Sequence, residues 1–295
     1  MPKGNDGAPA GGGYQAGPVP VTPASWVSIS GVVHDPAGPI EQPTGPGIGQ
    51  PADPGIDHGI GPGIDPGMDT QKRSSPATLG DAAVGFLAGL LASIVFGGIA
   101  AGVLGTDQPL MITAAGLIGL WAGLYWAAQR ASSKRGTGSV FRDFGVRFTA
   151  GDIGIGLAAG FLVQLAVALM YLPFSDLNSE LSAPARSLTE QAPGDGAMIL
   201  LTVLVVAGAP FIEELFFRGV LLGALRRFGA AIAVLVSAVA FSLVHFGQLL
   251  AMPAFVLLGV VLGVLAVWRD RLGAAIVTHS TFNAITMAVL LAPGP

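Results

Sequence analysis

Apolar residues gather in seven long stretches that fill the last three quarters of the chain. Most of these stretches approach the roughly 20 residues that a helix needs to cross a bilayer. The pattern therefore predicts an all-α fold, a polytopic transmembrane helical bundle of about seven spans within residues 81–295. The stretches are 82–105, 110–128, 153–172, 197–220, 229–250, 252–268 and 273–292.

Glycine and alanine are frequent in these stretches, and small residues allow helices to approach closely in lipid. Several glycines of the first stretch are of this kind. We expect them to serve helix packing and not a chemical site. They are Gly85, Gly89, Gly98 and Gly102.

The first 80 residues have a different character, because they are rich in proline, glycine and aspartate. A ragged repeat runs through them, as in Pro54-Gly55-Ile56-Asp57 and Pro62-Gly63-Ile64-Asp65. Proline blocks regular hydrogen bonding and few large side chains offset the entropy of ordering, so residues 1–80 are predicted to be a disordered tail. The start, Met1-Pro2-Lys3-Gly4-Asn5, lacks the apolar core of a signal peptide, and the tail is expected to be retained.

Lysine and arginine alternate between the connections of the predicted spans. The tail and the second, fourth and sixth connections carry them, whereas the first and fifth connections and the C-terminus carry none. The third connection has only Arg186 against four acidic residues. By the positive-inside rule, the N-terminus is expected in the cytoplasm and the C-terminus outside.

Composition agrees with a multi-pass integral membrane protein, which we expect in the plasma membrane. Hydrophobic residues make up 52% of the chain and charged residues only 11%, against about 25% charged residues in a typical soluble domain. This excludes an ordinary soluble enzyme. The net charge of −4 gives no indication of a nucleic acid partner, and the absence of cysteine excludes a thiolate metal site and a cysteine nucleophile.

Five ionisable residues lie inside the predicted spans, all of them in the last four. A charged residue at the centre of a transmembrane helix costs about 2.5–3.5 kcal/mol on insertion scales, so such residues usually serve a function. Glu214 and Arg218 are four residues apart and are expected to pair on one helix face. Glu213 points about 100° away, which leaves it free for chemistry. The remaining two are His245 and His279.

His279 and Asn283 are also four residues apart and share a helix face. Two chemistries suit this set. Glu213, His245 and His279 are candidate ligands of Zn²⁺, with an open position for water. Alternatively, a glutamate acts directly as the general base on water while histidine and asparagine stabilise an oxyanion.

The order of these residues resembles the CPBP family of intramembrane proteases, which comprises CAAX proteases and bacteriocin-processing enzymes and is also called the Abi family. The resemblance covers 197–292, about a third of the chain. It is carried by three motifs in order on apolar spans: Glu213-Glu214…Arg218, Phe241…His245 and His279…Asn283.

This resemblance implies an intramembrane endopeptidase that cleaves a peptide or a membrane-anchored protein. It implies that Glu213 is the general base and that Arg218 holds Glu214. It also implies that His245 and His279 position water or bind a metal, with Asn283 holding the oxyanion. Both a Zn²⁺ mechanism and a metal-independent glutamate mechanism are compatible with it.

The depth of His245 conflicts with a simple bundle, since it lies about 16 residues into a span that starts at Gly229. We therefore expect Arg226 and Arg227 to mark an interfacial turn and the fifth span to begin nearer Val234. Two other functions stay open: a non-catalytic immunity or scaffold protein of the same fold, and a proton-coupled transporter. The transporter is disfavoured because all buried polar residues lie in one half, without an inverted repeat.

Overall fold

A computed structural model describes residues 75–292. The predicted disorder of residues 1–80 therefore falls almost entirely outside the described residues. Within 75–292 every regular element is helical, and the prediction of an all-α bundle is confirmed. By length and composition, six helices can cross a membrane: Leu79–Leu104, Pro109–Arg135, Ala150–Phe174, Asp195–Phe228, Phe246–Arg269 and Gly273–Leu291.

The first two helices, α1 (Leu79–Leu104) and α2 (Pro109–Arg135), form a hairpin with a glycine seam. A Cβ added to Gly85 would lie 2.2 Å from that of Ala127, and one on Gly123 would lie 2.2 Å from the backbone of Gly89. Any larger residue would push the helices apart, which confirms a packing role for the first two predicted glycines.

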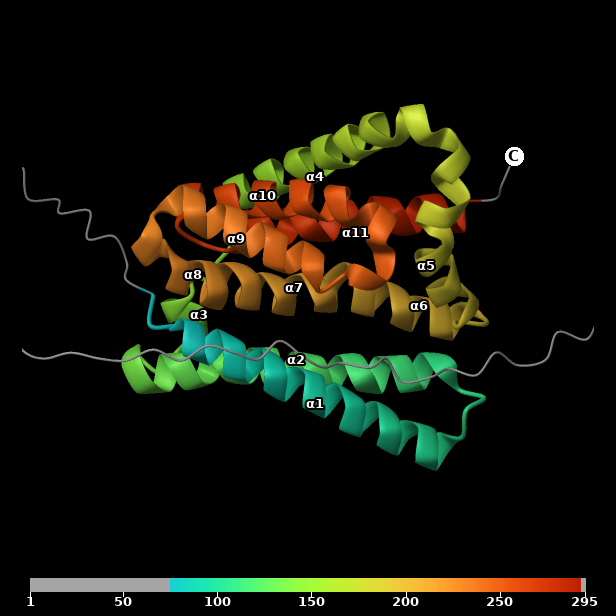
Figure 1. Cartoon of the computed structure of the whole chain (residues 1–295), viewed down its shortest axis with the longest axis horizontal. Helices are drawn as coiled ribbons and strands as arrows, with labels where there is room; N and C mark the ends of the chain where they lie inside the picture. The colour runs from blue at the N-terminus through green and yellow to red at the C-terminus, as the bar shows by residue number, and fades with distance from the viewer. Residues whose placement is uncertain (1–74, 293–295) are drawn as a thin grey trace, which may run out of the picture. The chain divides into compact units, whose positions relative to one another are not determined.

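The same prediction is wrong for Gly98 and Gly102, where no atom lies within 4 Å of an added Cβ. The reason is geometric. Gly98 and Gly102 lie on the face of α1 away from Gly85 and Gly89, and the two helices also diverge toward the connection at Gly105 (Figure 1).

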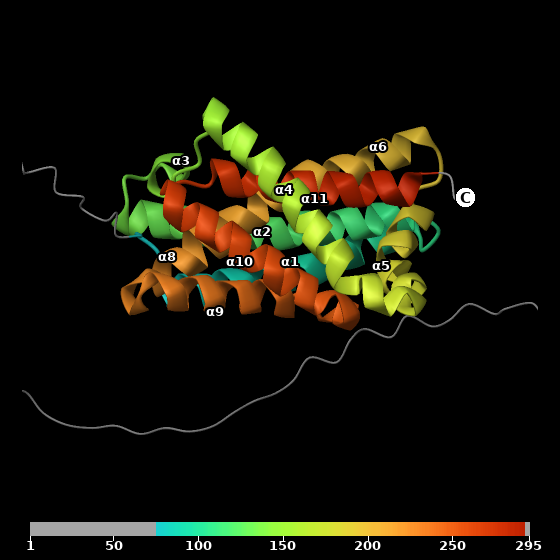
Figure 2. The same cartoon turned by 90° about the horizontal axis from the view of Figure 1, so that it is seen from above.

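The remaining long helices pack beside this hairpin. Helix α4 (Ala150–Tyr171) packs on α11 (Gly273–Leu291) through Gly156 and Gly160, and α9 (Ala230–Leu243) packs on α10 (Met252–Arg269) through Gly259. Within the described residues, α4 and the α1–α2 hairpin lie on opposite sides of α7, α9, α10 and α11 (Figure 1). In the view from above, α4 crosses over α10 and α11 (Figure 2).

Helices α1 and α4 begin with the same pattern, Thr78-Leu79-Gly80-Asp81 and Thr149-Ala150-Gly151-Asp152. In both, the threonine side chain caps the helix and the aspartate side chain reaches back to the threonine N–H, which satisfies two otherwise unpaired backbone groups. Each aspartate is buried and also binds two arginines from other segments. The pairs are Asp81 with Arg130 and Arg135, and Asp152 with Arg269 and Arg271.

A third aspartate closes the turn between α2 and the short helix α3 (Val140–Asp143). Asp143 accepts hydrogen bonds from the Ser132 hydroxyl at 2.5 Å and from the Thr137 N–H at 2.9 Å. Burial raises the pKa of Asp143, but these hydrogen bonds and the nearby Arg142 charge outweigh it, so the pKa lies below its ordinary value. We call Asp81, Asp143 and Asp152 the rim carboxylates.

A continuous run of helix over 195–228 carries the first motif. It begins as α6 (Asp195–Val203), contains α7 (Ala209–Glu214) and ends with α8 (Leu222–Leu225). Two π-helical turns, Leu204–Gly208 and Leu215–Leu221, separate these pieces. Such turns are rare and often occur at functional sites, and here they flank the two glutamates.

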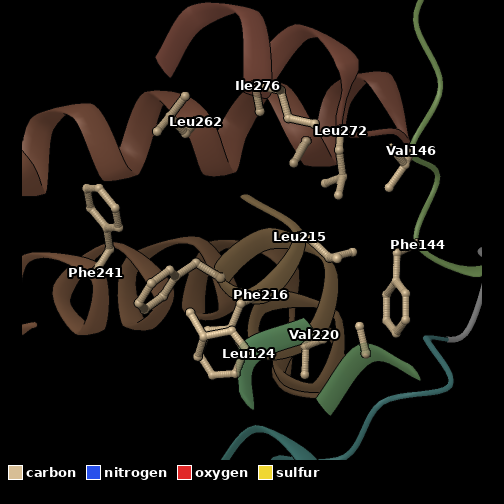
Figure 3. Packing of buried hydrophobic residues seen from close by; sticks show 14 of the residues in the cluster. Leu124, Phe144, Val146, Leu215, Phe216, Val220, Phe241, Leu262, Leu272 and Ile276 are labelled. Atoms are coloured by element: carbon tan, nitrogen blue, oxygen red, sulfur yellow. The ribbon is translucent and has the colours of Figure 1, made fainter. Parts of the chain in front are cut away.

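The largest buried apolar cluster surrounds this run (Figure 3). Leu215 and Phe216 lie in it with Leu124 of α2, Phe241 of α9 and Leu262 of α10. Burial of such side chains stabilises a protein by about 1.5–3 kcal/mol each in water. In lipid the same contacts act through close packing, so the cluster fixes the helices that carry the motifs.

The predicted start of the fifth span near Val234 is wrong. Arg226 and Arg227 do lie in a turn, the 3₁₀ segment Arg226–Phe228, but α9 runs unbroken from Ala230 to Leu243. Gly229 makes this abrupt restart possible because its φ of 102° is rarely open to other residues. With 14 residues, α9 extends only about 21 Å and ends before His245.

Candidate active site

Glu214 is the centre of a buried polar network between α7, α10 and α11. Its side chain is 0% exposed, and its Oε1 atom accepts hydrogen bonds from Arg218 Nη1 and His279 Nδ1, each at 2.9 Å. Because the carboxylate accepts both bonds, His279 carries its proton on Nδ1. The expected pairing of Glu214 with Arg218 is confirmed. We call Glu214, Arg218 and His279 the central network.

Arg218 is held from three sides. Besides Glu214, it donates through Nη2 to the Gly259 carbonyl of α10 at 3.2 Å, and its guanidinium lies 4.7 Å from the centre of the Phe241 ring. A desolvated cation over an aromatic face is favourable. These contacts compensate a charge whose side chain is 0% exposed, as a buried arginine requires.

Glu213 differs sharply from its neighbour. Its side chain is 19% exposed, and the Nε2 atom of His279 lies 3.9 Å from Glu213 Oε2. This distance exceeds a direct hydrogen bond. The imidazole of His279 thus stands between the two glutamates: Nδ1 is bound to Glu214, and Nε2 faces Glu213.

The buried Phe241 connects the second motif to this network. Its ring lies 5.5 Å from that of His279 and 4.9 Å from that of His245. The His245 Nδ1 atom donates to the Phe241 carbonyl at 2.9 Å, and its ring packs on Phe255 at 4.4 Å. The two motif histidines therefore share one aromatic neighbour, and both hold a proton on Nδ1.

Asn283 lies in the same helix as His279 but is bound elsewhere. Its Nδ2 atom donates to the Val205 carbonyl at 2.8 Å. That carbonyl lies in a π-helical turn in which the Ala209 N–H bonds to Leu204, five residues back. The next residue is Pro210, which has no N–H to donate. Asn283 thus supplies the hydrogen bond that the proline cannot.

The six candidate residues are only partly assembled. The central network, Glu213, His245 and Phe241 form one connected group, whereas Asn283 donates to the Val205 carbonyl between α6 and α7. Within residues 75–292, no three His, Asp or Glu side chains are grouped as metal ligands require. Glu213, His245 and His279 therefore do not form a fitting Zn²⁺ site in this structure, and we derive no step through a metal.

Two features of the site were not predicted from the sequence. The motif Phe241…His245 marked the position of Phe241, but its contacts with both histidines and Arg218 were not predicted. The role of Asn283 was indicated indirectly by Pro210. A proline inside a helical stretch has no N–H, so one carbonyl of the preceding turn lacks its helical hydrogen bond and needs another donor. Only the fold shows which side chain replaces that donor.

Comparison with known proteins agrees with the motifs. Residues 195–285 match the family model described as type II CAAX prenyl endopeptidase Rce1-like, and all six candidate residues lie inside that match. No curated protein and no solved structure matches the chain. At the level of the family, the match supports an intramembrane peptidase. Over residues 195–285, the chain is thus similar to the Rce1-like type II CAAX prenyl endopeptidases, as the three motifs indicated.

Proposed function

We propose that this chain is an intramembrane endopeptidase in which Glu213 activates the attacking water. One observation carries the proposal: two adjacent glutamates have opposite surroundings and are joined by one imidazole. Glu214 is fully buried and bound to Arg218 and His279, whereas Glu213 is partly exposed and lies 3.9 Å from His279 Nε2. A base must be free to take a proton, and Glu213 is the free one.

In the proposed reaction, water gives a proton to Glu213 and its oxygen attacks the peptide carbonyl. The carbonyl oxygen becomes an oxyanion, to which the side-chain amide of Asn283 donates a hydrogen bond. The proton on Glu213 then passes to the leaving amine as the peptide bond breaks. Glu214 holds His279 Nδ1, so that Nε2 stays directed toward Glu213.

His245 and Asn283 enter as supporting groups. His245 has its Nδ1 bound to the Phe241 carbonyl, which leaves Nε2 for water or substrate. Asn283 is assigned to the oxyanion by the family resemblance. In the ligand-free state its Nδ2 is bound to Val205, so this role needs a shift of that amide or its second N–H.

The direct test compares cells that carry the wild type with cells that carry Glu213→Gln. Peptide termini would be catalogued in membranes and in the medium. Loss of a general base lowers a rate about 10²–10⁴-fold, so uncleaved precursors should accumulate in the variant. The matched control is Glu190→Gln on the exposed end of α5 (Asn178–Glu190), which should cleave normally.

Normal cleavage by Glu213→Gln at equal membrane levels would overturn the mechanism. A biological effect that survives this substitution would favour the non-catalytic immunity or scaffold function instead. Proton-coupled uptake by the purified protein in liposomes would favour the transporter.

Metal dependence has its own test, because no three suitable ligands are grouped within residues 75–292. We expect purified protein to cleave at its original rate after exhaustive treatment with a strong Zn²⁺ chelator. A loss of cleavage that added Zn²⁺ restores would instead establish the metal mechanism.

The proposed orientation follows from the lysine and arginine pattern. The N-terminus lies in the cytoplasm and the C-terminus outside, in the plasma membrane. All four arginines bound to rim carboxylates at the start of α1 and α4 belong to this pattern's second and sixth connections. That end of the bundle is therefore the cytoplasmic one in this proposal.

A further inference from the structure

A cavity of about 440 Å³ lies between α5 and the segment 246–251. Its volume falls in the range of about 300–1,000 Å³ that is typical of ligand pockets. Apolar side chains, among them Leu181, Leu249 and Leu250, form much of its wall, and Glu180 contributes a carboxylate. Nothing in the reaction derived above uses this cavity.

The cavity adjoins the proposed active site. Its wall 246–251 directly follows His245, and α10 leads from this wall to Phe255, whose ring packs on His245 at 4.4 Å. A chain segment bound in the cavity would therefore lie next to the end of α9 that presents His245.

The cavity lies at the end of the bundle opposite to the bound arginines. At one end of α4, Asp152 pairs with Arg269 and Arg271. At the other end, the Tyr171 hydroxyl donates to the carbonyl of Leu250 in the cavity wall at 2.5 Å. Asp152 and Tyr171 are 19 residues apart on this helix, which corresponds to about 28 Å.

Charge distinguishes the occupant from a lipid chain. Glu180 is exposed at the cavity, and its neighbourhood along the chain is acidic, with Asp176 and Glu190 against the single Arg186. A carboxylate beside an apolar wall favours a ligand that carries both a cationic group and apolar side chains.

We propose that this cavity binds the substrate of the peptidase, and that the substrate is a peptide segment with apolar side chains and a lysine or arginine beside them. It reaches the site from the face opposite to Arg269 and Arg271, which is the non-cytoplasmic face in the proposed orientation. This inference rests on the proposed function and adds the substrate class and its side of approach.

The side of approach is tested by labelling, and the chain suits this test because it contains no cysteine. Leu249→Cys lies on the cavity wall at a side chain 69% exposed, and Lys134→Cys lies at the arginine-bearing end. A membrane-impermeant maleimide applied to intact cells should label Leu249→Cys and reach Lys134→Cys only after permeabilisation. The reverse result would overturn the proposed side of approach.

Recognition is tested on the precursors that accumulate in Glu213→Gln cells. Glu180→Lys should slow their cleavage about tenfold, and most for precursors with a basic residue near the cleavage point. Glu190→Lys, on the same helix but outside the cavity wall, is the matched control and should cleave normally. Ala251→Trp, which fills the cavity, should slow cleavage of all precursors about tenfold or more.

The outcomes separate the two proposals. If Glu213→Gln accumulates precursors while Glu180→Lys and Ala251→Trp cleave at the wild-type rate, the peptidase stands and the cavity is not its substrate site. If Ala251→Trp alone has an effect, the cavity binds an uncharged chain and the basic residue is excluded from the substrate class. If Glu213→Gln accumulates no precursor, the proposed function fails and this inference fails with it.

Discussion

The central network and the rim carboxylates both contain carboxylate–arginine pairs, but the hydrogen bonding of the two regions differs. In both, buried carboxylates bind arginine. At the rim, Asp152 is satisfied completely: it accepts from the backbone and hydroxyl of Thr149 and from Arg269 and Arg271. In the central network, Glu214 Oε2 and Arg218 Nε have no hydrogen-bond partner among the described residues.

This difference indicates which group is built for stability and which for chemistry. A saturated carboxylate at a helix start caps the helix and ties loops together. An unsaturated network in the interior has a free-energy cost, because unpaired buried polar atoms are unfavourable. Such a cost is typical of functional sites, and here it lies next to the exposed face of Glu213.

The largest loss of stability is expected when the buried ion pair between Glu214 and Arg218 is broken. Glu214→Gln leaves Arg218 as an uncompensated buried cation, which should lower the free energy of unfolding by about 3–5 kcal/mol. It also weakens the bond to His279 Nδ1, because a neutral amide oxygen replaces a charged acceptor, so cleavage should fall in any protein that still folds. Thermal unfolding in detergent and cleavage of an identified precursor would measure the two effects.

A double variant separates stability from catalysis at the same site. Glu214→Leu with Arg218→Met replaces the ion pair by apolar groups, which is often neutral for stability. We expect an unfolding temperature near that of the wild type and no cleavage, since nothing orients His279. Wild-type cleavage by this pair would show that the central network is only structural.

A smaller effect is expected at the rim. Asp152→Asn weakens a helix cap and two ion pairs whose arginine side chains are 23% and 18% exposed. We expect a loss of about 1–2 kcal/mol, with cleavage per folded molecule unchanged. Asp107→Asn, in the exposed α1–α2 connection, is the control and should change neither quantity. A specific loss of cleavage in Asp152→Asn would remove the distinction between the two regions.

The smallest effect concerns pH. Hydrogen bonds from Ser132 and Thr137 lower the pKa of Asp143 below its ordinary value of 3.8. Its contribution to stability is therefore complete above pH 3.8 and is lost as the pH falls through the lower folded-state pKa. The difference in unfolding temperature between the wild type and Asp143→Asn should be constant above about pH 5 and shrink in stronger acid. A difference that grows in acid would contradict this assignment.

Hydropathy predicted most of the fold because the bilayer requires long apolar helices. It failed at the fifth span, where the left-handed backbone of Gly229 lets α9 restart directly after a turn that contains Arg226 and Arg227. The packing prediction failed at Gly98 and Gly102, because these two glycines lie on the face of α1 away from Gly85 and Gly89.

The site was predicted as a set of residues but not as an arrangement. Spacing of four predicted the bond between Glu214 and Arg218, because both lie on one helix. Spacing could not predict that His279 binds Glu214, since 65 residues and several turns separate them. The sequence repeats one four-residue pattern at the start of α1 and of α4, in which a threonine is followed by Asp81 or Asp152. The arginines that bind these two aspartates come from distant segments and could not be read from the pattern.

The glycine seam of the α1–α2 hairpin also bears on biogenesis. Its contacts join residues within 85–127, all of which leave the ribosome before residues 195–285. Contacts of short sequence separation form fastest, and helices that have inserted can associate independently in the bilayer. The hairpin is thus suited to insert first as a finished unit, against which Phe216 and its neighbours later pack. The catalytic helices would then assemble on a surface that already exists.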